Sequence, residues 1–196
     1  MRIVAIGFVC IFFNACSRAP AIRALPADAV ILAFGDSLTS GTGVAPEESY
    51  PAVLQRLIGR TVINAGVPGE LSRDGRSRLP HLVEPLNPSL VLICHGGNDF
   101  LQQRGQDEVR QNLTEMIQFL QARGIDIILI GVPQVSLLQR TAPLYRELAK
   151  KYHLPYEGKV LSEIISTPSL KSDQIHPNAQ GYQKLAEAIA NLIPTP

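Results

Sequence analysis

Cysteine is scarce in this chain, which has three in 196 residues. Cys10 and Cys16 lie within the first sixteen residues, so only Cys94 remains for the body of the chain. A disulfide within the body is therefore excluded unless Cys16 takes part in it. Cys94 ends the apolar run Leu90–Cys94, and its simplest interpretation is a small buried hydrophobic residue.

An excess of charge of either sign is also missing. The 18 Lys and Arg residues are balanced by 17 Asp and Glu residues, and the formal net charge is +1. Because no basic run stands out, the sequence lacks the electrostatic footprint of a nucleic-acid-binding protein, and a small molecule is the expected partner. The four His residues form neither a His-x-x-x-His pair nor a cluster with Cys, so we expect no metal site.

Several common catalytic and nucleotide-binding motifs are absent as well. No Gly-x-Ser-x-Gly occurs, which argues against the nucleophile elbow of the α/β-hydrolase fold. Gly41 and Gly43 begin a pattern like a dinucleotide-binding loop, but Pro46 occupies its last glycine position, and no Walker motif is found.

The amino terminus contains the longest apolar run, residues 3–13, which is too short to cross a bilayer as a stable helix. It follows Met1-Arg2 and precedes Asn14-Ala15-Cys16, so we interpret residues 1–16 as a signal peptide. A cysteine at this point resembles the bacterial lipobox, in which the cysteine is lipidated. Phe13 and Asn14 depart from that motif, and an ordinary secreted protein with an unlipidated Cys16 remains an alternative. Both readings predict export, to the periplasm or to a membrane through lipidated Cys16.

The rest of the chain is expected to form one domain. Residues 17–28 are rich in Ala and Pro and lack helical or strand periodicity, so they are predicted to be a linker. Residues 29–196 are long enough for a single domain with a sizeable core, and they contain no internal repeat.

Strand and helix patterns alternate along this domain. This alternation is typical of an α/β fold in which helices cover both faces of a parallel sheet. The expected strands are 30–34, 61–65, 90–94, 126–131 and 154–156, and the expected helices are 50–58, 71–82, 108–122, 142–152 and 178–192. Ligands of such sheets bind at the carboxyl edge, so the residues that follow the strands are the candidates for function.

Ser37 is the first of these candidates. It follows a buried strand in the tetrapeptide Gly35-Asp36-Ser37-Leu38, which makes it a candidate nucleophile. A single serine in a turn is more often a helix cap or a turn former, so partners elsewhere must support this role.

Two further loops and a carboxyl-terminal segment supply possible partners. Gly66 and Asn98 follow the next two expected strands. Asp173 precedes His176 by three residues, a spacing that lets the carboxylate accept the Nδ1 proton of the imidazole. Pro177 suits the first position of a following helix, and the alternative is a capped helix start with a surface histidine.

Together these segments resemble the SGNH hydrolases, or GDSL-type esterases and lipases. The four blocks occur in the family's order, as Gly35-Asp36-Ser37-Leu38, Asn64-Ala65-Gly66-Val67-Pro68-Gly69, Gly96-Gly97-Asn98-Asp99 and Asp173-Gln174-Ile175-His176-Pro177. The second block departs from the family, because Pro68 and Glu70 replace the Ser and Asp often found there.

The resemblance implies a three-layer α/β/α fold of the flavodoxin type with a mostly parallel five-stranded sheet. It assigns Ser37 as nucleophile, His176 as general base and Asp173 as its orienting residue. It also implies an oxyanion hole formed by the N–H groups of Ser37 and Gly66 and the side chain of Asn98. No cofactor is required.

Within the family, the chain looks most like the bacterial arylesterase, acyl-thioesterase and lysophospholipase branch. The expected substrate is therefore a small acyl ester or thioester, with loops 67–80 and 132–142 as candidate walls of an acyl groove. Alternatives are a carbohydrate acetylesterase with the same triad and a catalytically silent, acyl-binding surface lipoprotein. The sequence leaves the oligomeric state open, with a monomer as the expectation.

Overall fold

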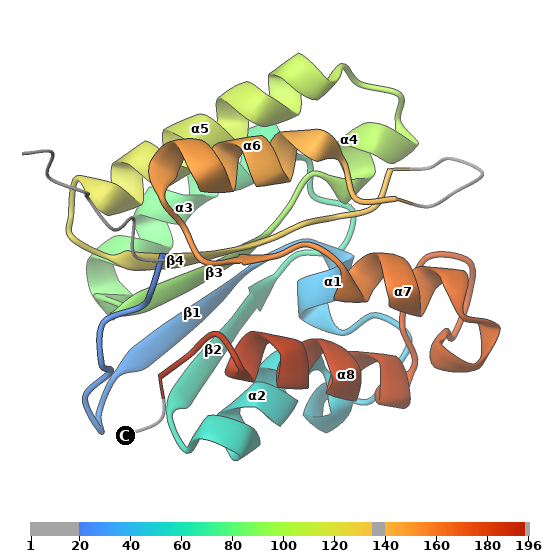
Figure 1. Cartoon of the computed structure of the whole chain (residues 1–196), viewed down its shortest axis with the longest axis horizontal. Helices are drawn as coiled ribbons and strands as arrows, with labels where there is room; N and C mark the ends of the chain where they lie inside the picture. Colours follow the sequence, from blue (N-terminus) through green and yellow to red (C-terminus); the bar gives the residue numbers. More distant parts are fainter. Residues whose placement is uncertain (1–19, 135–139, 195–196) are drawn as a thin grey trace, which may run out of the picture.

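A five-stranded parallel sheet forms the centre of the molecule (Figure 1). The computed structural model describes residues 20–134 and 140–194; the expected signal peptide, with Cys16, lies outside these ranges. The strand order is β2-β1-β3-β4-β5. The strands are β1 (Val30–Gly35), β2 (Thr61–Gly66), β3 (Leu90–Cys94), β4 (Asp126–Ile130) and β5 (Tyr156–Glu157).

Two interior strands of the sheet, β1 and β3, are hydrophobic along their whole length. All five residues of β3 are buried, as are Ile31 to Gly35 of β1. This is the pattern of a parallel strand that is covered on both faces, where polar side chains would lose their contact with water. The predicted α/β fold with a five-stranded sheet is confirmed.

Helices cover both faces of the sheet (Figure 1). Helices α3, α5 and α6 lie on one face, and α2 and α8 lie on the other, with the short α1, α4 and α7 near the carboxyl ends of the strands. Their bounds are α1 (Ser37–Ser40), α2 (Tyr50–Ile58), α3 (Ser72–Leu86), α4 (Gly97–Leu101), α5 (Gln106–Gln121), α6 (Pro143–Tyr152), α7 (Val160–Ser166) and α8 (Ala179–Ala190). Single 3₁₀ turns occur at Pro46–Glu48 and Pro168–Leu170. In the described part of the chain, no helix has both the length and the apolar character needed to span a membrane.

Helix α3 contains residues that usually weaken helices, yet it is one of the longest. It continues through Pro80 and Pro85 to Leu86, four residues beyond its expected end. Gly75 is required by packing, since a Cβ atom there would lie 2.3 Å from Nε2 of His95. The smallest residue therefore lets α3 pack closely against the end of β3.

Three other segments differ from the expected pattern. Helices α4 and α7 are not among the expected helices, although four of the seven residues of α7 are buried. Helix α8 begins at Ala179, with the side chain of Asn178 accepting a hydrogen bond from the N–H of Gly181. Pro177 therefore precedes the cap and is not the first helical residue.

The described end of the expected linker lies against the domain. Ile22 is buried in the hydrophobic core, and Arg23 forms an ion pair with Asp126 at the start of β4, with 3.1 Å between Nε and Oδ1. Residues 20–28 are thus in contact with the sheet's amino-terminal edge.

Candidate active site

Ser37 is the first residue of α1, and only Asp36 separates it from the end of β1. The turn is held by Asp36, a buried residue whose side-chain Oδ1 accepts a hydrogen bond from the N–H of Leu38 at 3.1 Å. Burial raises the pKa of the Asp36 carboxyl, although His95 and the N–H of Leu38 oppose this effect. The strand and the capped turn together fix the position of Ser37 at the carboxyl edge of the sheet.

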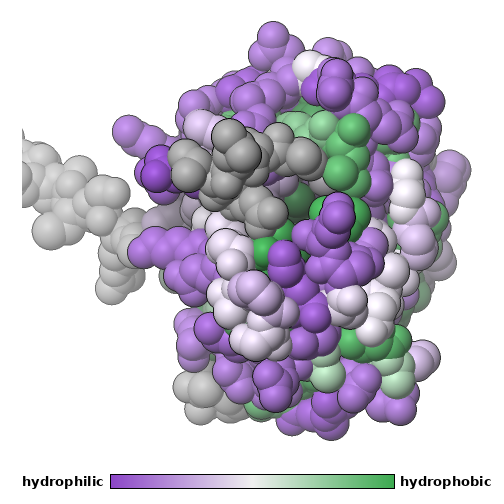
Figure 2. Space-filling view, turned by 90° about the vertical axis from the view of Figure 1, so that its right-hand side faces the viewer, coloured by the Kyte–Doolittle hydropathy of each residue, from purple (hydrophilic) through white to green (hydrophobic). Residues whose placement is uncertain are grey.

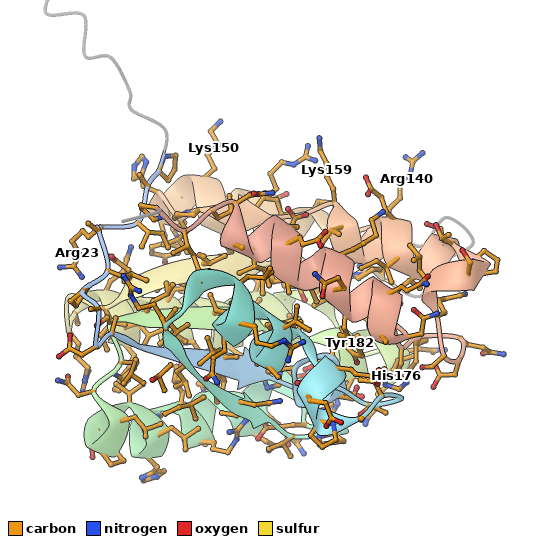
Figure 3. The ribbon with its side chains drawn as sticks, turned by 90° about the horizontal axis from the view of Figure 1, so that it is seen from below. Arg23, Arg140, Lys150, Lys159, His176 and Tyr182 are labelled. Atoms are coloured by element: carbon orange, nitrogen blue, oxygen red, sulfur yellow. The ribbon has the colours of Figure 1, made fainter. Side chains whose placement is uncertain are left out.

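His176 contacts Ser37 directly. Its Nε2 atom lies 3.0 Å from Oγ of Ser37, and its Nδ1 atom lies 2.7 Å from Oδ2 of Asp173. His176 lies at the same end of the sheet as α1 (Figure 3). The structure thus brings together all three residues that the resemblance assigns to a triad. The distances are those of hydrogen bonds, which a nucleophile and its base require.

The Asp173 carboxylate is held by the loop that carries it. Its Oδ1 atom accepts hydrogen bonds from the N–H groups of Ile175 and His176, both at 2.8 Å. Partial burial acts to raise the pKa of Asp173, but the hydrogen bonds from the His176 side chain and these two N–H groups lower it to about 2. The carboxylate is therefore ionised throughout the neutral range, and it keeps the Nδ1 proton of His176 on its own side of the ring.

Asn98, in α4, is the third polar side chain at this edge. Its Nδ2 atom donates to the main-chain carbonyl of Glu70 at 3.0 Å and makes a longer contact of 3.4 Å with Oδ2 of Asp36. The shorter bond fixes the orientation of the amide. The second N–H has only the long contact and is the one that an incoming oxygen atom could take over.

The two glycines of the second block differ in their surroundings. The N–H of Gly66 donates to Oδ1 of Asn64 at 3.0 Å, so the structure does not leave this predicted oxyanion donor free. Gly69 lies in the turn closed by the N–H of Glu70 and the carbonyl of Val67 at 3.1 Å, and its φ is +79°. In the described residues, the N–H of Gly69 has no hydrogen-bond acceptor.

A cavity of about 90 Å³ lies beside Ser37, Asn98 and His176. Most of its remaining wall is apolar, and Figure 2 shows hydrophobic side chains reaching the surface in the middle of this face. The apolar lining consists of Leu38, Leu101, Val132, Pro133, Ile165 and Ile175. Of the two loops expected to form an acyl groove, 132–142 contributes Val132 to this lining, whereas no residue of 67–80 lines the cavity. Val135, Leu137 and Leu138 of the first loop lie outside the described residues. In residues 20–134 and 140–194, no three His, Cys, Asp or Glu side chains gather in a way that could hold a metal ion.

A partly buried ionic cluster lies next to Asn98. The guanidinium of Arg78 binds both carboxylate oxygens of Glu70, at 2.7 and 2.6 Å, and Nε2 of His95 lies 3.0 Å from the same carboxylate. Burial acts to raise the pKa of Glu70, but the hydrogen bonds from Arg78 and His95 lower it to about 2. No motif in the sequence links these side chains, because Arg78 and His95 lie 8 and 25 positions beyond Glu70.

Comparison with known proteins gives a consistent result. The sequence model of the GDSL-like Lipase/Acylhydrolase family matches residues 33–184. The chain is 29% identical to "Thioesterase 1/protease 1/lysophospholipase L1" of Escherichia coli over 176 residues, which is 86% of this chain and 84% of the relative. It is also 29% identical to an arylesterase of Vibrio mimicus, covering 82% and 86% of the two chains.

Solved structures of similar proteins have the same fold. The esterase AlinE4, described as a member of the SGNH-hydrolase family, is 34% identical and superposes with a TM-score of 0.68, covering 86% of this chain and 96% of its own. The esterase EstA from Pseudoalteromonas superposes with a TM-score of 0.75, covering 84% and 96% of the two chains. At 23% identity, this second likeness bears on the fold alone.

Proposed function

The chain belongs to the GDSL-like lipase/acylhydrolase family, and from this we propose that it is a serine esterase for small acyl esters or thioesters. The observation that carries the proposal is the contact of 3.0 Å between Oγ of Ser37 and Nε2 of His176. Asp173 holds the opposite ring nitrogen at 2.7 Å. In this arrangement the imidazole accepts the hydroxyl proton, and the Asp173 carboxylate stabilises the positive charge that forms on the ring.

The reaction proceeds in two half-reactions. Oγ of Ser37 attacks the carbonyl carbon of the substrate as Nε2 of His176 accepts the hydroxyl proton. The tetrahedral intermediate then expels the alcohol or thiol, which takes this proton from His176, and an acyl-serine ester remains. In the second half-reaction, water attacks the acyl-serine ester as His176 accepts its proton. Oγ of Ser37 is then the leaving group, takes this proton from His176, and the carboxylic acid is released.

The negative charge on the tetrahedral oxygen requires hydrogen-bond donors in fixed positions. We assign the N–H of Ser37 and the second N–H of the Asn98 amide as two of them. For the third, the N–H of Gly69 is a better candidate than that of Gly66, because Gly66 already donates to Asn64. The turn that contains Gly69 lies next to Asn98, since the following residue, Glu70, accepts the hydrogen bond from the Asn98 amide.

The acyl chain would occupy the apolar cavity beside Ser37. Two of the hydrophobic residues at its wall, Leu101 and Ile175, are 43% and 38% exposed, so apolar surface at the site is still in contact with water. An acyl chain that covered them would gain the free energy of removing apolar surface from water. This lining favours an acyl substrate over a polar carbohydrate acetate.

Two measurements on the purified protein test the function. A fluorophosphonate probe should label the wild-type protein and should fail to label Ser37→Ala; no labelling of the folded wild type would favour the silent, acyl-binding alternative. The second measurement uses a panel of p-nitrophenyl esters and acyl thioesters with acyl groups of two to sixteen carbons, together with acetylated xylo-oligosaccharides. We expect the highest kcat/KM for an acyl group longer than acetyl. Activity confined to acetylated sugars would favour the acetylesterase alternative.

The variant Leu101→Ala tests the acyl site itself. Removing three carbons from the cavity wall should lower kcat/KM for octanoate about five- to tenfold and leave acetate within about twofold. Leu57→Ala is the matched control, because Leu57 is 47% exposed but lies on α2, away from the site. Equal losses for both esters would argue against an acyl site at Leu101.

We also propose that the protein is exported and that Cys16 is lipidated. The support is the signal-peptide pattern of residues 1–16, with a cysteine at its end. Cells that express the full chain should incorporate labelled palmitate into the wild type but not into Cys16→Ala. A soluble, unlipidated wild-type protein outside the cytoplasm would support the alternative of an ordinary secreted protein. Analytical ultracentrifugation of the purified protein would then test whether it is a monomer, as expected.

A further inference from the structure

We infer that Glu70, Arg78 and His95 form a positioning unit that orients the Asn98 amide for oxyanion binding. This inference rests on the proposed esterase function. None of the three side chains lines the cavity beside Ser37, so they act through Asn98 and not on the substrate.

Glu70 is the residue that links the ionic cluster to the oxyanion site. Its main-chain carbonyl accepts the hydrogen bond that orients Asn98, at 3.0 Å, while its side chain is bound by Arg78 and His95. The Glu70 side chain is only 8% exposed. A carboxylate with so little access to water restrains the backbone of its residue, because separating it from Arg78 and His95 would leave an unpaired charge that water cannot fully solvate.

Arg78 connects Glu70 to the ends of two strands. Besides its two bonds to the carboxylate, Nη2 of Arg78 donates to the carbonyl of Ala65 in β2 at 3.0 Å. Its guanidinium also lies 4.4 Å from the centre of the Phe34 ring in β1. A planar guanidinium can satisfy these partners together, which a lysine ammonium cannot do with the same geometry. The turn is thereby tied to β2 and to β1, the strand that presents Ser37.

His95 links the cluster to β3. The ring is fully buried, and its Nδ1 atom accepts a hydrogen bond from the N–H of Gly96 at 3.1 Å. The proton on the ring is therefore on Nε2, where it is donated to the Glu70 carboxylate. Gly75 leaves the space that the ring occupies. Because His95 precedes Asn98 by three residues, the unit holds Asn98 through its own chain segment as well as through Glu70.

A loss of this support should affect catalysis more than substrate binding. An oxyanion donor must meet the oxygen in the transition state, so a small displacement of Asn98 lowers kcat with little change in KM. An ionic cluster that only stabilised the fold would lower the melting temperature and leave the kinetic constants of the folded enzyme unchanged. These two roles therefore differ in a measurable way.

The test is a double-mutant cycle between Glu70→Gln and Asn98→Ala, measured on a p-nitrophenyl ester that the wild type hydrolyses. Glu70→Gln alone should lower kcat about 10- to 100-fold and change KM less than about twofold. In the Asn98→Ala background, the same change should cost less than about threefold, because the group being positioned is gone. The matched control is Glu115→Gln in α5. It breaks a surface ion pair with Arg76, which lies in α3 like Arg78, and should leave kcat unchanged.

Two outcomes would overturn the inference while the esterase function stands: unchanged kcat in Glu70→Gln, or an equal loss with and without Asn98. If Glu70→Gln does not fold, the pair His95→Gln and His95→Phe decides the question. The glutamine amide can still donate to Glu70, whereas phenylalanine cannot, so kcat should be largely retained in the first variant and reduced at least tenfold in the second. Equal activity of the two would reject the positioning unit. Absence of hydrolysis by the wild type would reject the proposed function instead.

Discussion

Oγ of Ser37 and Nε2 of His176 lie 3.0 Å apart, although 139 residues separate them in the sequence. Ser37 is presented by the end of β1, which lies between β2 and β3 in the sheet, and His176 by the loop before α8, a helix that covers one face of the sheet. The packing of α8 against α2 brings the two together. This contact makes the hydroxyl a candidate nucleophile in place of a simple turn former.

The first prediction concerns the nucleophile. Ser37→Ala removes the attacking oxygen and should reduce kcat by roughly 10⁴- to 10⁶-fold, as nucleophile removal does in serine proteases. The melting temperature should change little, because the caps of α1 are formed by Asp36 and Gly41, not by the Ser37 hydroxyl. Steady-state kinetics and thermal unfolding measure the two effects. A variant that keeps more than about one hundredth of the activity would remove Ser37 from this role.

The second prediction concerns the group that orients the base. Asp173→Asn should lower kcat roughly 10²- to 10⁴-fold, because the amide would favour the ring tautomer that carries its proton on Nε2, which cannot accept the proton of Ser37. The N–H groups of Ile175 and His176 can still bind the remaining oxygen, so the loop should keep its shape. Kinetics and melting temperature check both statements. A loss of less than about threefold would mean that Asp173 does not set the tautomer.

The third prediction is the pH dependence. The pKa of Asp173 is lowered from an ordinary 3.8 to about 2, so this carboxylate stays ionised at every pH at which the enzyme is assayed. Its contribution to stability is complete above about pH 4 and is lost as the pH falls toward 2; at 52% exposure it is small. Because Asp173 keeps its charge in this range, the acid limb of kcat/KM should follow a single ionisation, that of the general base, with activity rising as the pH increases. If kcat/KM does not change between about pH 5 and 8, His176 is not the general base.

Much of the fold can be predicted from the sequence because the central strands are continuous apolar runs between glycine-containing turns. The observed β3, Leu90–Cys94, has the expected bounds. Helices α4 and α7 could not be predicted, since segments of five and seven residues have little helical stability of their own and depend on tertiary packing. Helix α3 is longer than the sequence predicts. Pro80 and Pro85 normally end a helix, but here the free energy gained by burying one face of α3 outweighs the cost of the two prolines.

The site shows the same division between local and long-range information. Ser37, Asp173 and His176 lie in short motifs, so their candidacy is visible in the sequence, and the structure brings their side chains together. Contacts that depend on tertiary packing are not visible there. Nothing in the sequence indicates that Asn64 binds the N–H of Gly66, or that Glu70 meets His95.

The fourth prediction concerns the oxyanion. Asn98→Ala should lower kcat about 10²- to 10³-fold, the usual cost of removing one oxyanion-hole donor, with KM nearly unchanged. The variant also leaves the Glu70 carbonyl without its side-chain donor, so melting temperature should be measured alongside the rate. Asn112→Ala is a useful comparison, because this buried amide bonds to Ser72 and not to the turn; it should lower stability and spare kcat. A loss below tenfold for Asn98→Ala would remove this side chain from the oxyanion hole.

The fifth prediction concerns the fit of α3 against β3. Replacing a helical glycine with alanine usually stabilises a helix by about 0.5–1 kcal/mol, but Gly75→Ala should destabilise the protein. Its Cβ would lie 2.3 Å from Nε2 of the fully buried His95, and overpacking of this kind costs about 1–3 kcal/mol. For a chain of this length the melting temperature should fall by about 3–10 °C.

Gly105→Ala is the control for this prediction, because a Cβ at Gly105 meets nothing within 4 Å and the residue has an ordinary φ of −62°. It should change the stability by less than about 1 kcal/mol. Since a displaced His95 ring would also strain its hydrogen bond to Glu70, Gly75→Ala should reduce kcat even at temperatures where the protein is fully folded. An unchanged or raised melting temperature for Gly75→Ala would mean that α3 and β3 can separate freely, and that the tight packing around His95 is not required.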